Sequence, residues 1–125
     1  MKSKYKVIYT PEASEDLRSI YYHIAKRLFA PIAARNQVNR IRKEIRDLDM
    51  LPSRYAFIEW EPWHSMGVHC FPVDNYSILY TINEEQLRVD IVRIFYSGQN
   101  IASIGNKQML KDDNSIYRIE KAFFT

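Results

Sequence analysis

Three residues in the second half of the chain have side chains suited to acid–base or phosphate chemistry. His69 has an ordinary pKa of about 6.5, which suits proton transfer near neutral pH. Tyr96 can donate a proton or stack on a nucleobase, and Arg93 has a guanidinium that can bind a phosphate or an acidic partner. A base, an acid and a cation are the groups that acid–base chemistry at a phosphate requires, so these residues are catalytic candidates.

Each candidate also has a purely structural interpretation. A lone histidine in a strand is commonly exposed or hydrogen-bonded at the surface, and a tyrosine at a strand end is commonly an aromatic at the edge of the core. Arg93 lies in an apolar segment between Val92 and Ile94, where a guanidinium is costly to bury unless it is paired. Its expected partners in that case are three acids: Glu59, Glu61 and Asp90.

Neither a metal centre nor an organic cofactor is expected. Cys70 is the single cysteine, which excludes an internal disulfide framework and a cysteine-rich zinc site. His64 and His69 lack the further ligands that a zinc site needs. The sequence also has no glycine-rich phosphate loop and no Ser–His–Asp arrangement. Any catalysis is therefore expected to be metal-independent.

The composition is typical of one globular domain. The chain has 125 residues, of which 46% are hydrophobic and 26% charged. No apolar run approaches the ~20 residues that cross a bilayer, so we expect a cytoplasmic protein without a membrane partner. The charge is uneven, because residues 1–55 contain 12 Lys or Arg and 6 Asp or Glu although the whole chain has a net charge of only +3. The basic half is where a nucleic acid or an acidic protein segment can bind.

The elements that position these residues follow from the apolar spacing. Residues 4–9 are predicted to form a strand, because they are rich in aromatic and β-branched residues. Thr10 is the expected N-cap of a helix with proline at its first position, and apolar residues at helical spacing continue to residue 28. Pro31 begins a second amphipathic helix that ends before Pro52. The joint between the helices is short, so they should fold back as an antiparallel hairpin.

The second helix also has a basic outer face. Such a face is usually only solvated, and its functional interpretation is a docking surface for rRNA, DNA or an acidic partner segment. Its members are Arg35, Arg40, Arg42, Lys43 and Arg46.

After Pro52 the pattern changes to strands. The order strand, helix, helix, strands predicts an α+β fold, in which the helix hairpin packs on one face of a small antiparallel sheet of about four strands. We expect a single domain, with residues 1–101 as its body and residues 102–125 as an extension packed on it. A short C-terminal helix is expected over residues 115–124. The strands predicted after Pro52 are residues 56–60, 68–71, 76–82 and 87–96.

Three stretches of the chain resemble the RelE/ParE superfamily, the toxins of bacterial type II toxin–antitoxin systems, also called plasmid stabilisation proteins. With the helix hairpin between them, the resemblance covers about residues 4–101. It implies a small toxin that a cognate antitoxin neutralises by forming a hetero-oligomer with it. The stretches are residues 5–13 (YKVIYTPEA) with Asp16 and Leu17, residues 71–80 (FPVDNYSILY) and residues 89–96 (VDIVRIFY).

The superfamily divides by target. RelE-like members cut mRNA on the ribosome with a cluster of Lys and Arg on and just after the sheet strands, whereas ParE-like members poison DNA gyrase. The corresponding positions here are Val68, Cys70, Ser77 and Ser97, and none of these residues is cationic. The resemblance therefore favours a ParE-like gyrase poison. Two alternatives stay open: an interaction protein that keeps the fold without toxicity, and a ribosome-dependent mRNA endoribonuclease that uses His69, Arg93 and Tyr96.

Overall fold

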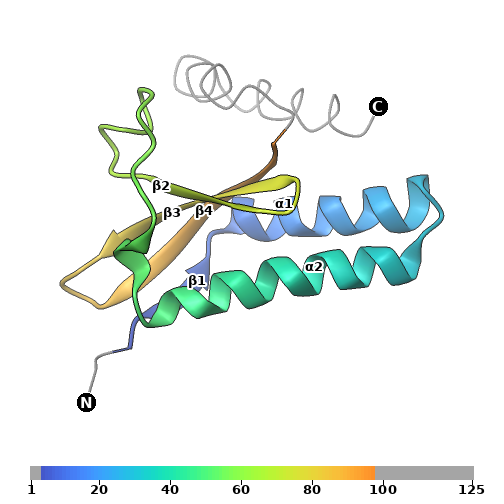
Figure 1. Cartoon of the computed structure of the whole chain (residues 1–125), viewed down its shortest axis with the longest axis horizontal. Coiled ribbons are helices and arrows are strands. Elements are labelled where there is room, and N and C mark those ends of the chain that lie inside the picture. The colour runs from blue at the N-terminus through green and yellow to red at the C-terminus, as the bar shows by residue number, and fades with distance from the viewer. Residues whose placement is uncertain (1–3, 98–125) are drawn as a thin grey trace.

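A helix hairpin lies against one face of a four-stranded sheet in this computed structural model, which describes residues 4–97 (Figure 1). The order of the strands across the sheet is β1-β4-β3-β2, so the last strand in sequence is central and pairs with the first. The predicted α+β layers are confirmed. The elements in chain order are β1 (Lys6–Tyr9), α1 (Pro11–Tyr22), α2 (Pro31–Arg46), β2 (His69–Val73), β3 (Tyr76–Asn83) and β4 (Arg88–Tyr96).

The start of α1 is fixed by Thr10, as the sequence predicts. Its side-chain oxygen accepts a hydrogen bond from the backbone N–H of Ala13 at 3.1 Å, and Pro11 occupies the first helical position. The helix continues into a π-helical turn at His23–Arg27 before the chain reverses into α2. The buried stripe of α1 then faces that of α2, which closes the predicted hairpin. The buried apolar residues of the two helices are Ala13, Leu17, Ile20, Ala34, Ile41 and Ile45.

The sheet is mixed rather than wholly antiparallel. β2 with β3 and β3 with β4 are antiparallel, but β1 pairs with β4 in parallel, from Lys6 beside Arg88 to Tyr9 beside Ile91. The physical reason is the hairpin itself. Because α1 runs out and α2 runs back, the chain re-enters the sheet from the end at which β1 began, which makes β2 and β4 parallel to β1.

Residues 56–60 do not form the predicted strand. They contribute one isolated bridge, Phe57 with His69, and the surrounding segment is a loop. The loop covers the face of the sheet that the helices leave open, because Ile58 and Trp63 pack there against Leu79. Burial of these two side chains holds the segment in place, together with backbone hydrogen bonds from the N–H of Ile58 to the carbonyl of Val68 and from the N–H of Cys70 to the carbonyl of Ala56.

The core therefore lies on both faces of the sheet. The larger cluster is between the helices and the sheet and includes Tyr80 and Ile91. The smaller cluster is under the loop and includes Val68 and Phe95. The expected C-terminal helix at 115–124 and the extension 102–125 fall outside the described residues. Within residues 4–97, no helix has the length and apolar character needed to span a bilayer.

Candidate functional site

Arg93 is held in a buried ion pair with Asp16 of α1. Its Nε donates to Oδ2 of Asp16 at 2.8 Å and its Nη2 donates to Oδ1 at 2.9 Å, while the backbone N–H of Ile94 donates to Oδ2 at 2.9 Å. Arg93 is 4% exposed and Asp16 is 5% exposed. Burial raises the pKa of the Asp16 carboxyl, whereas the guanidinium and the Ile94 amide act on that pKa in the opposite direction.

This pairing corrects the partner expected for Arg93. The guanidinium of Arg93 forms its ion pair with Asp16, which is not one of the three acids expected from the sequence. Of those three, Asp90 pairs with Arg88 at 2.8 Å. Asp16 was missed because it lies 77 residues away in sequence. A signal was present, however: Asp16 falls within the apolar stripe of α1, between Ala13 and Ile20. A carboxylate at such a position needs a buried cation.

His69 is also buried, at 6% exposure, in a stack of rings. Its imidazole lies 4.1 Å from the ring of Phe57 and 5.0 Å from the ring of Tyr80, measured between centroids. Nδ1 is 2.7 Å from the carbonyl oxygen of Tyr55. Because a carbonyl only accepts hydrogen bonds, Nδ1 carries the proton. His69 thus joins the loop to the sheet.

Tyr96 ends β4 and is 38% exposed. Its ring meets that of Tyr76, the residue paired with it on β3, edge to face at a centroid distance of 5.9 Å. Within the described residues it is the most accessible of the three catalytic candidates.

The three candidates do not converge on one point. His69 pairs with Tyr80 and Arg93 pairs with Leu79, two consecutive residues of β3 that belong to the cores on opposite faces of the sheet. Tyr96 lies beside Tyr76 at the start of β3, four residues before the Tyr80 that pairs with His69, and four residues span about 13 Å at the usual rise of a strand.

The sheet positions that correspond to a RelE-like cationic cluster are all occupied by neutral residues. Val68 is buried, and burial raises the pKa of the half-buried Cys70 thiol. The hydroxyls of Ser77 and Ser97 are hydrogen-bonded to each other at 3.2 Å. Nothing at these four positions offers a positive charge to a phosphate.

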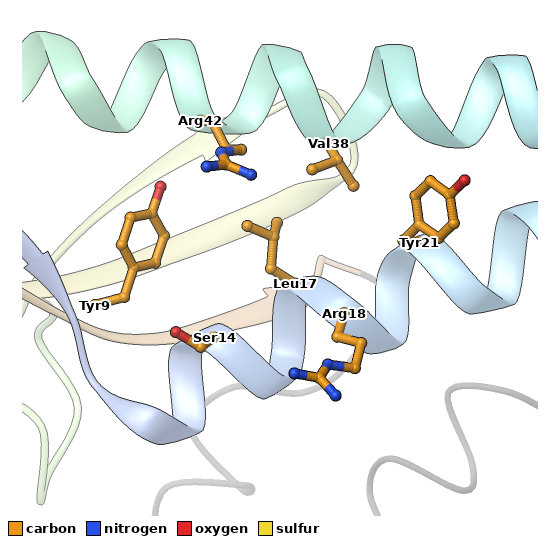
Figure 2. A pocket seen from close by; sticks show the side chains of 7 residues that line it. All are labelled: Tyr9, Ser14, Leu17, Arg18, Tyr21, Val38 and Arg42. Atoms are coloured by element: carbon orange, nitrogen blue, oxygen red, sulfur yellow. The ribbon is translucent and has the colours of Figure 1, made fainter.

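The surface between the two helices contains a groove (Figure 2). It has a volume of about 380 Å³ and an adjoining hollow of about 190 Å³ that shares Tyr9 and Arg42 with it. Leu17 and Val38 give the groove an apolar floor. The remaining residues that line the two hollows are Val7, Ser14, Arg18, Tyr21, Ile45 and Arg46.

One end of the groove is positively charged. Arg42 and Arg46 are one helical turn apart on α2, and neither makes an ion pair with any residue in the range 4–97. Figure 2 shows the hydroxyl end of Tyr9 directed toward Arg42. Burial raises the pKa of Tyr9, and the two arginines act to lower it, as expected for cations close to the phenol. The groove therefore combines an apolar floor with a set of donors suited to an anion.

The basic residues expected to form one face of α2 have different environments in the structure. Arg40 is paired with Asp74 at 2.8 Å and Lys43 with Asp47 at 3.5 Å, so these two charges are used within the fold. Arg42 and Arg46 line the groove, while Arg35 is exposed on the helix surface. A groove beside the helix hairpin and the contacts of Arg42 and Arg46 could be expected from the sequence, but the part of Tyr9 could not, because Tyr9 belongs to a strand whose position beside α2 depends on the whole fold. Over residues 4–97, no group of three or more His, Cys, Asp or Glu gathers as metal ligands.

The chain is similar to known toxins and toxin–antitoxin structures in both sequence and fold. Residues 7–101 match the family described as ParE toxin of the type II toxin-antitoxin system, parDE. The fold is similar to that of a chain of the chromosomal ParDE system from P. aeruginosa, with 23% identity, a TM-score of 0.61, and coverage of 74% of this chain and 95% of that one. It is also similar to a chain of the RelBE2 toxin–antitoxin complex from Mycobacterium tuberculosis, with 21% identity, a TM-score of 0.55, and coverage of 79% and 98%. No curated protein matches the sequence.

The family match begins in β1 and extends past the end of β4, so it includes the whole sheet and both helices. The two solved structures share the arrangement of these elements. The chain therefore belongs to the ParE toxin family of type II toxin–antitoxin systems.

Proposed function

We propose that this toxin inhibits growth by poisoning DNA gyrase and that a cognate antitoxin neutralises it by forming a hetero-oligomer with it. The observation that favours gyrase over mRNA is the dispersal of the titratable residues on the sheet. His69 and Arg93 lie on opposite faces, so they cannot act on one phosphate. A toxin whose action depends on binding a protein target needs no such convergence.

The ribosome-dependent nuclease is the less favoured alternative. In-line cleavage of RNA requires a base and an acid within hydrogen-bond reach of the same nucleotide. Arg93 is buried and bound to Asp16 by two hydrogen bonds, and His69 is enclosed between two aromatic rings. Only Tyr96 is accessible to a substrate, and one phenol does not supply both proton transfers.

The groove between α1 and α2 is the proposed antitoxin site. A segment with an acidic side chain beside an apolar one would place its carboxylate against Arg42 and Arg46, and its apolar side chain on Leu17 and Val38. Antitoxin segments that are disordered alone can bind in this way by folding onto an apolar groove.

The test is induction of the toxin in growing cells, with and without the neighbouring gene, while DNA breaks and mRNA integrity are followed. We expect double-strand breaks and an SOS response with intact mRNA, and growth restored by the neighbouring gene. Early mRNA cleavage without DNA breaks would overturn the gyrase proposal and favour the nuclease.

Variants of the three catalytic candidates, tested in the same assay, distinguish the gyrase proposal from the nuclease alternative. For a gyrase poison, Tyr96→Phe should remain fully toxic, because no proton transfer depends on its hydroxyl. For the nuclease, Tyr96→Phe, His69→Ala and Arg93→Ala should all lose toxicity. The Tyr96→Phe result is the informative one, since the ring and its contact with Tyr76 are kept and the fold should be unaffected.

A further inference from the structure

The connection between α1 and α2 exposes a compact apolar point. Leu28 is 59% exposed, Phe29 is 87% exposed and Ile32 is 65% exposed. Together with Lys26, Arg27 and Arg35, these residues are here called the hairpin tip. The tip is at the end of the hairpin remote from β1 (Figure 1). Exposed side chains of this size are usually kept for an interaction when they occur as a cluster.

The backbone at the tip is held in a costly conformation that aims Phe29 outward. Phe29 has a φ of 55°, in the left-handed region that bulky residues rarely adopt. The π-helical turn His23–Arg27 precedes it, and π-turns are often found at functional sites. Two backbone bonds fix the arrangement, from the N–H of Leu28 to the carbonyl of His23 and from the N–H of Ala30 to the carbonyl of Ile24. A glycine or asparagine would fit here without strain, so Phe29 is not explained by the turn.

The charged residues that flank the tip in sequence are all basic. No Asp or Glu occurs between Asp16 and Glu44, a stretch that contains seven Lys or Arg. Lys26, Arg27 and Arg35 make no ion pair within the described part of the chain, whereas Arg18, Arg40 and Lys43 of the same hairpin are paired with acids. The charges nearest the tip are therefore available to an external anion.

We propose that the hairpin tip binds duplex DNA, with Phe29 and Leu28 inserted between base pairs and Lys26, Arg27 and Arg35 on the flanking phosphates. Apolar side chains that unstack a base step, next to basic residues on the backbone, are a known mode of DNA binding. A lipid surface is favoured less, because membrane-surface helices spread their apolar residues along one face. Here Phe29, the most exposed residue of the tip, and its neighbour Leu28 lie in the connection between the helices rather than on a helix face. The inference goes beyond the proposed action on gyrase, and its test uses DNA without gyrase.

Binding and unstacking can be measured separately on one DNA probe. The purified full chain is titrated into a short fluorescein-labelled duplex that contains 2-aminopurine. Anisotropy reports binding, and 2-aminopurine fluorescence reports unstacking. Three phosphate contacts predict that the association constant falls about 40-fold between about 50 and 200 mM KCl. The 2-aminopurine signal should rise on saturation.

The two parts of the proposal have separate variants. Phe29→Asn should abolish the 2-aminopurine signal and weaken binding about tenfold, with the salt dependence unchanged. The double variant Arg27→Gln with Arg35→Gln should weaken binding and reduce the log–log salt slope by about two units. Matched controls are Trp60→Ala, an exposed aromatic on the 55–68 loop, and Lys43→Gln, a cation already paired with Asp47. Both controls should bind as the unmodified chain does.

The stability of Phe29→Asn distinguishes a binding role from a structural role, since a structural role predicts that the variant is less stable. Asparagine tolerates a positive φ, so Phe29→Asn should leave the midpoint of urea unfolding unchanged or raise it while DNA binding is lost. Equal DNA binding by Phe29→Asn and the unmodified chain would overturn the proposal. Binding to vesicles of phosphatidylglycerol and phosphatidylcholine without binding to DNA would also overturn it, as would binding to gyrase alone.

Discussion

At the scale of single residues, the chain uses its most reactive-looking groups to hold the fold together. The Asp16 carboxylate accepts two bonds from Arg93 and one from the Ile94 amide, so every buried charge in the pair has a partner. Such a pair contributes little net stability compared with apolar residues of equal size, yet removing one member leaves an uncompensated buried charge.

The first prediction concerns this pair. Arg93→Ala and Asp16→Ala should each lower the free energy of unfolding by about 3–5 kcal/mol, and the double variant should cost clearly less than the sum. Urea denaturation of the three variants and the unmodified chain measures both effects. Additive losses, within about 0.5 kcal/mol, would contradict the coupling.

The second prediction separates structure from catalysis at His69. Phenylalanine keeps the ring between Phe57 and Tyr80 and loses only the hydrogen bond to the Tyr55 carbonyl. His69→Phe should therefore cost about 1 kcal/mol of stability and leave toxicity unchanged. Growth inhibition at matched expression levels is the readout, and loss of toxicity in a folded variant would restore the nuclease hypothesis.

The sequence indicated which residues were unusual but not what they touch. Arg93 stands out in an apolar strand, and its need for a partner followed from the cost of burying a charge. The identity of that partner depends on where α1 crosses β4, which no local pattern reports. For His69 likewise, the ring stack depends on how the 55–68 loop folds over the sheet edge.

At the scale of elements, the beginning of α1 completes the edge of β4 where β1 ends. The N–H of Thr10 donates to the carbonyl of Ile91, and its hydroxyl donates to the carbonyl of Val92 at 3.1 Å. Asp16 then accepts from the N–H of Ile94. These groups of Thr10 and Asp16 thus bond to the backbone of β4 at positions where a longer β1 would have paired with it.

The third prediction tests that junction. Thr10→Val removes both the helix cap and the bond to Val92, and should lower the free energy of unfolding by about 1–2 kcal/mol. Ser14→Ala lies in the same turn of α1, makes neither bond, and serves as the control. Thermal or urea unfolding measures the stability of both variants. Equal stability of Thr10→Val and Ser14→Ala would contradict the role given to Thr10.

The fourth prediction concerns the groove. Arg42→Glu places a negative charge beside Tyr9 and Arg46, so affinity for the antitoxin encoded by the neighbouring gene should fall at least about tenfold. Arg35→Glu makes the same change of charge on α2 outside the groove and should leave that affinity unchanged. Titration calorimetry with the purified antitoxin measures both. Equal losses would show that overall charge, rather than the groove, determines binding.

Elements with strong periodicity were predictable, and those fixed by distant contacts were not. The helices followed from Pro11, Pro31 and the apolar stripes, and β3 from its alternation. The segment 56–60 has strand-like residues, but only Ile58 is buried, so packing made it a loop. The parallel pairing of β1 with β4 was missed because a four-residue strand has no sequence feature that identifies its neighbour.

At the scale of the whole molecule, the sheet is organised around β4. It is the central partner of both β1 and β3, and it contributes residues to the cores on both faces. Arg93 on this strand ties the sheet to α1. Without β4, the core between the helices and the sheet loses Val89, Ile91 and Ile94, and β1 loses its partner strand.

The fifth prediction follows from that position. A fragment that ends at residue 86 contains both helices and two of the three long strands, but it should show no cooperative unfolding transition and no toxicity. Circular dichroism during urea titration, with the full chain for comparison, measures the first effect. A cooperative transition in the fragment would contradict the central role of β4.

The pairing of the first strand with the last also has a consequence during synthesis. β1 leaves the ribosome early, but its partner does not exist until residue 96 has been added, about 5–20 s later at ordinary rates of elongation. Until then the nascent chain has neither a finished sheet nor a stable groove. We therefore expect incomplete products of a damaged message or an aborted round of translation to lack toxicity.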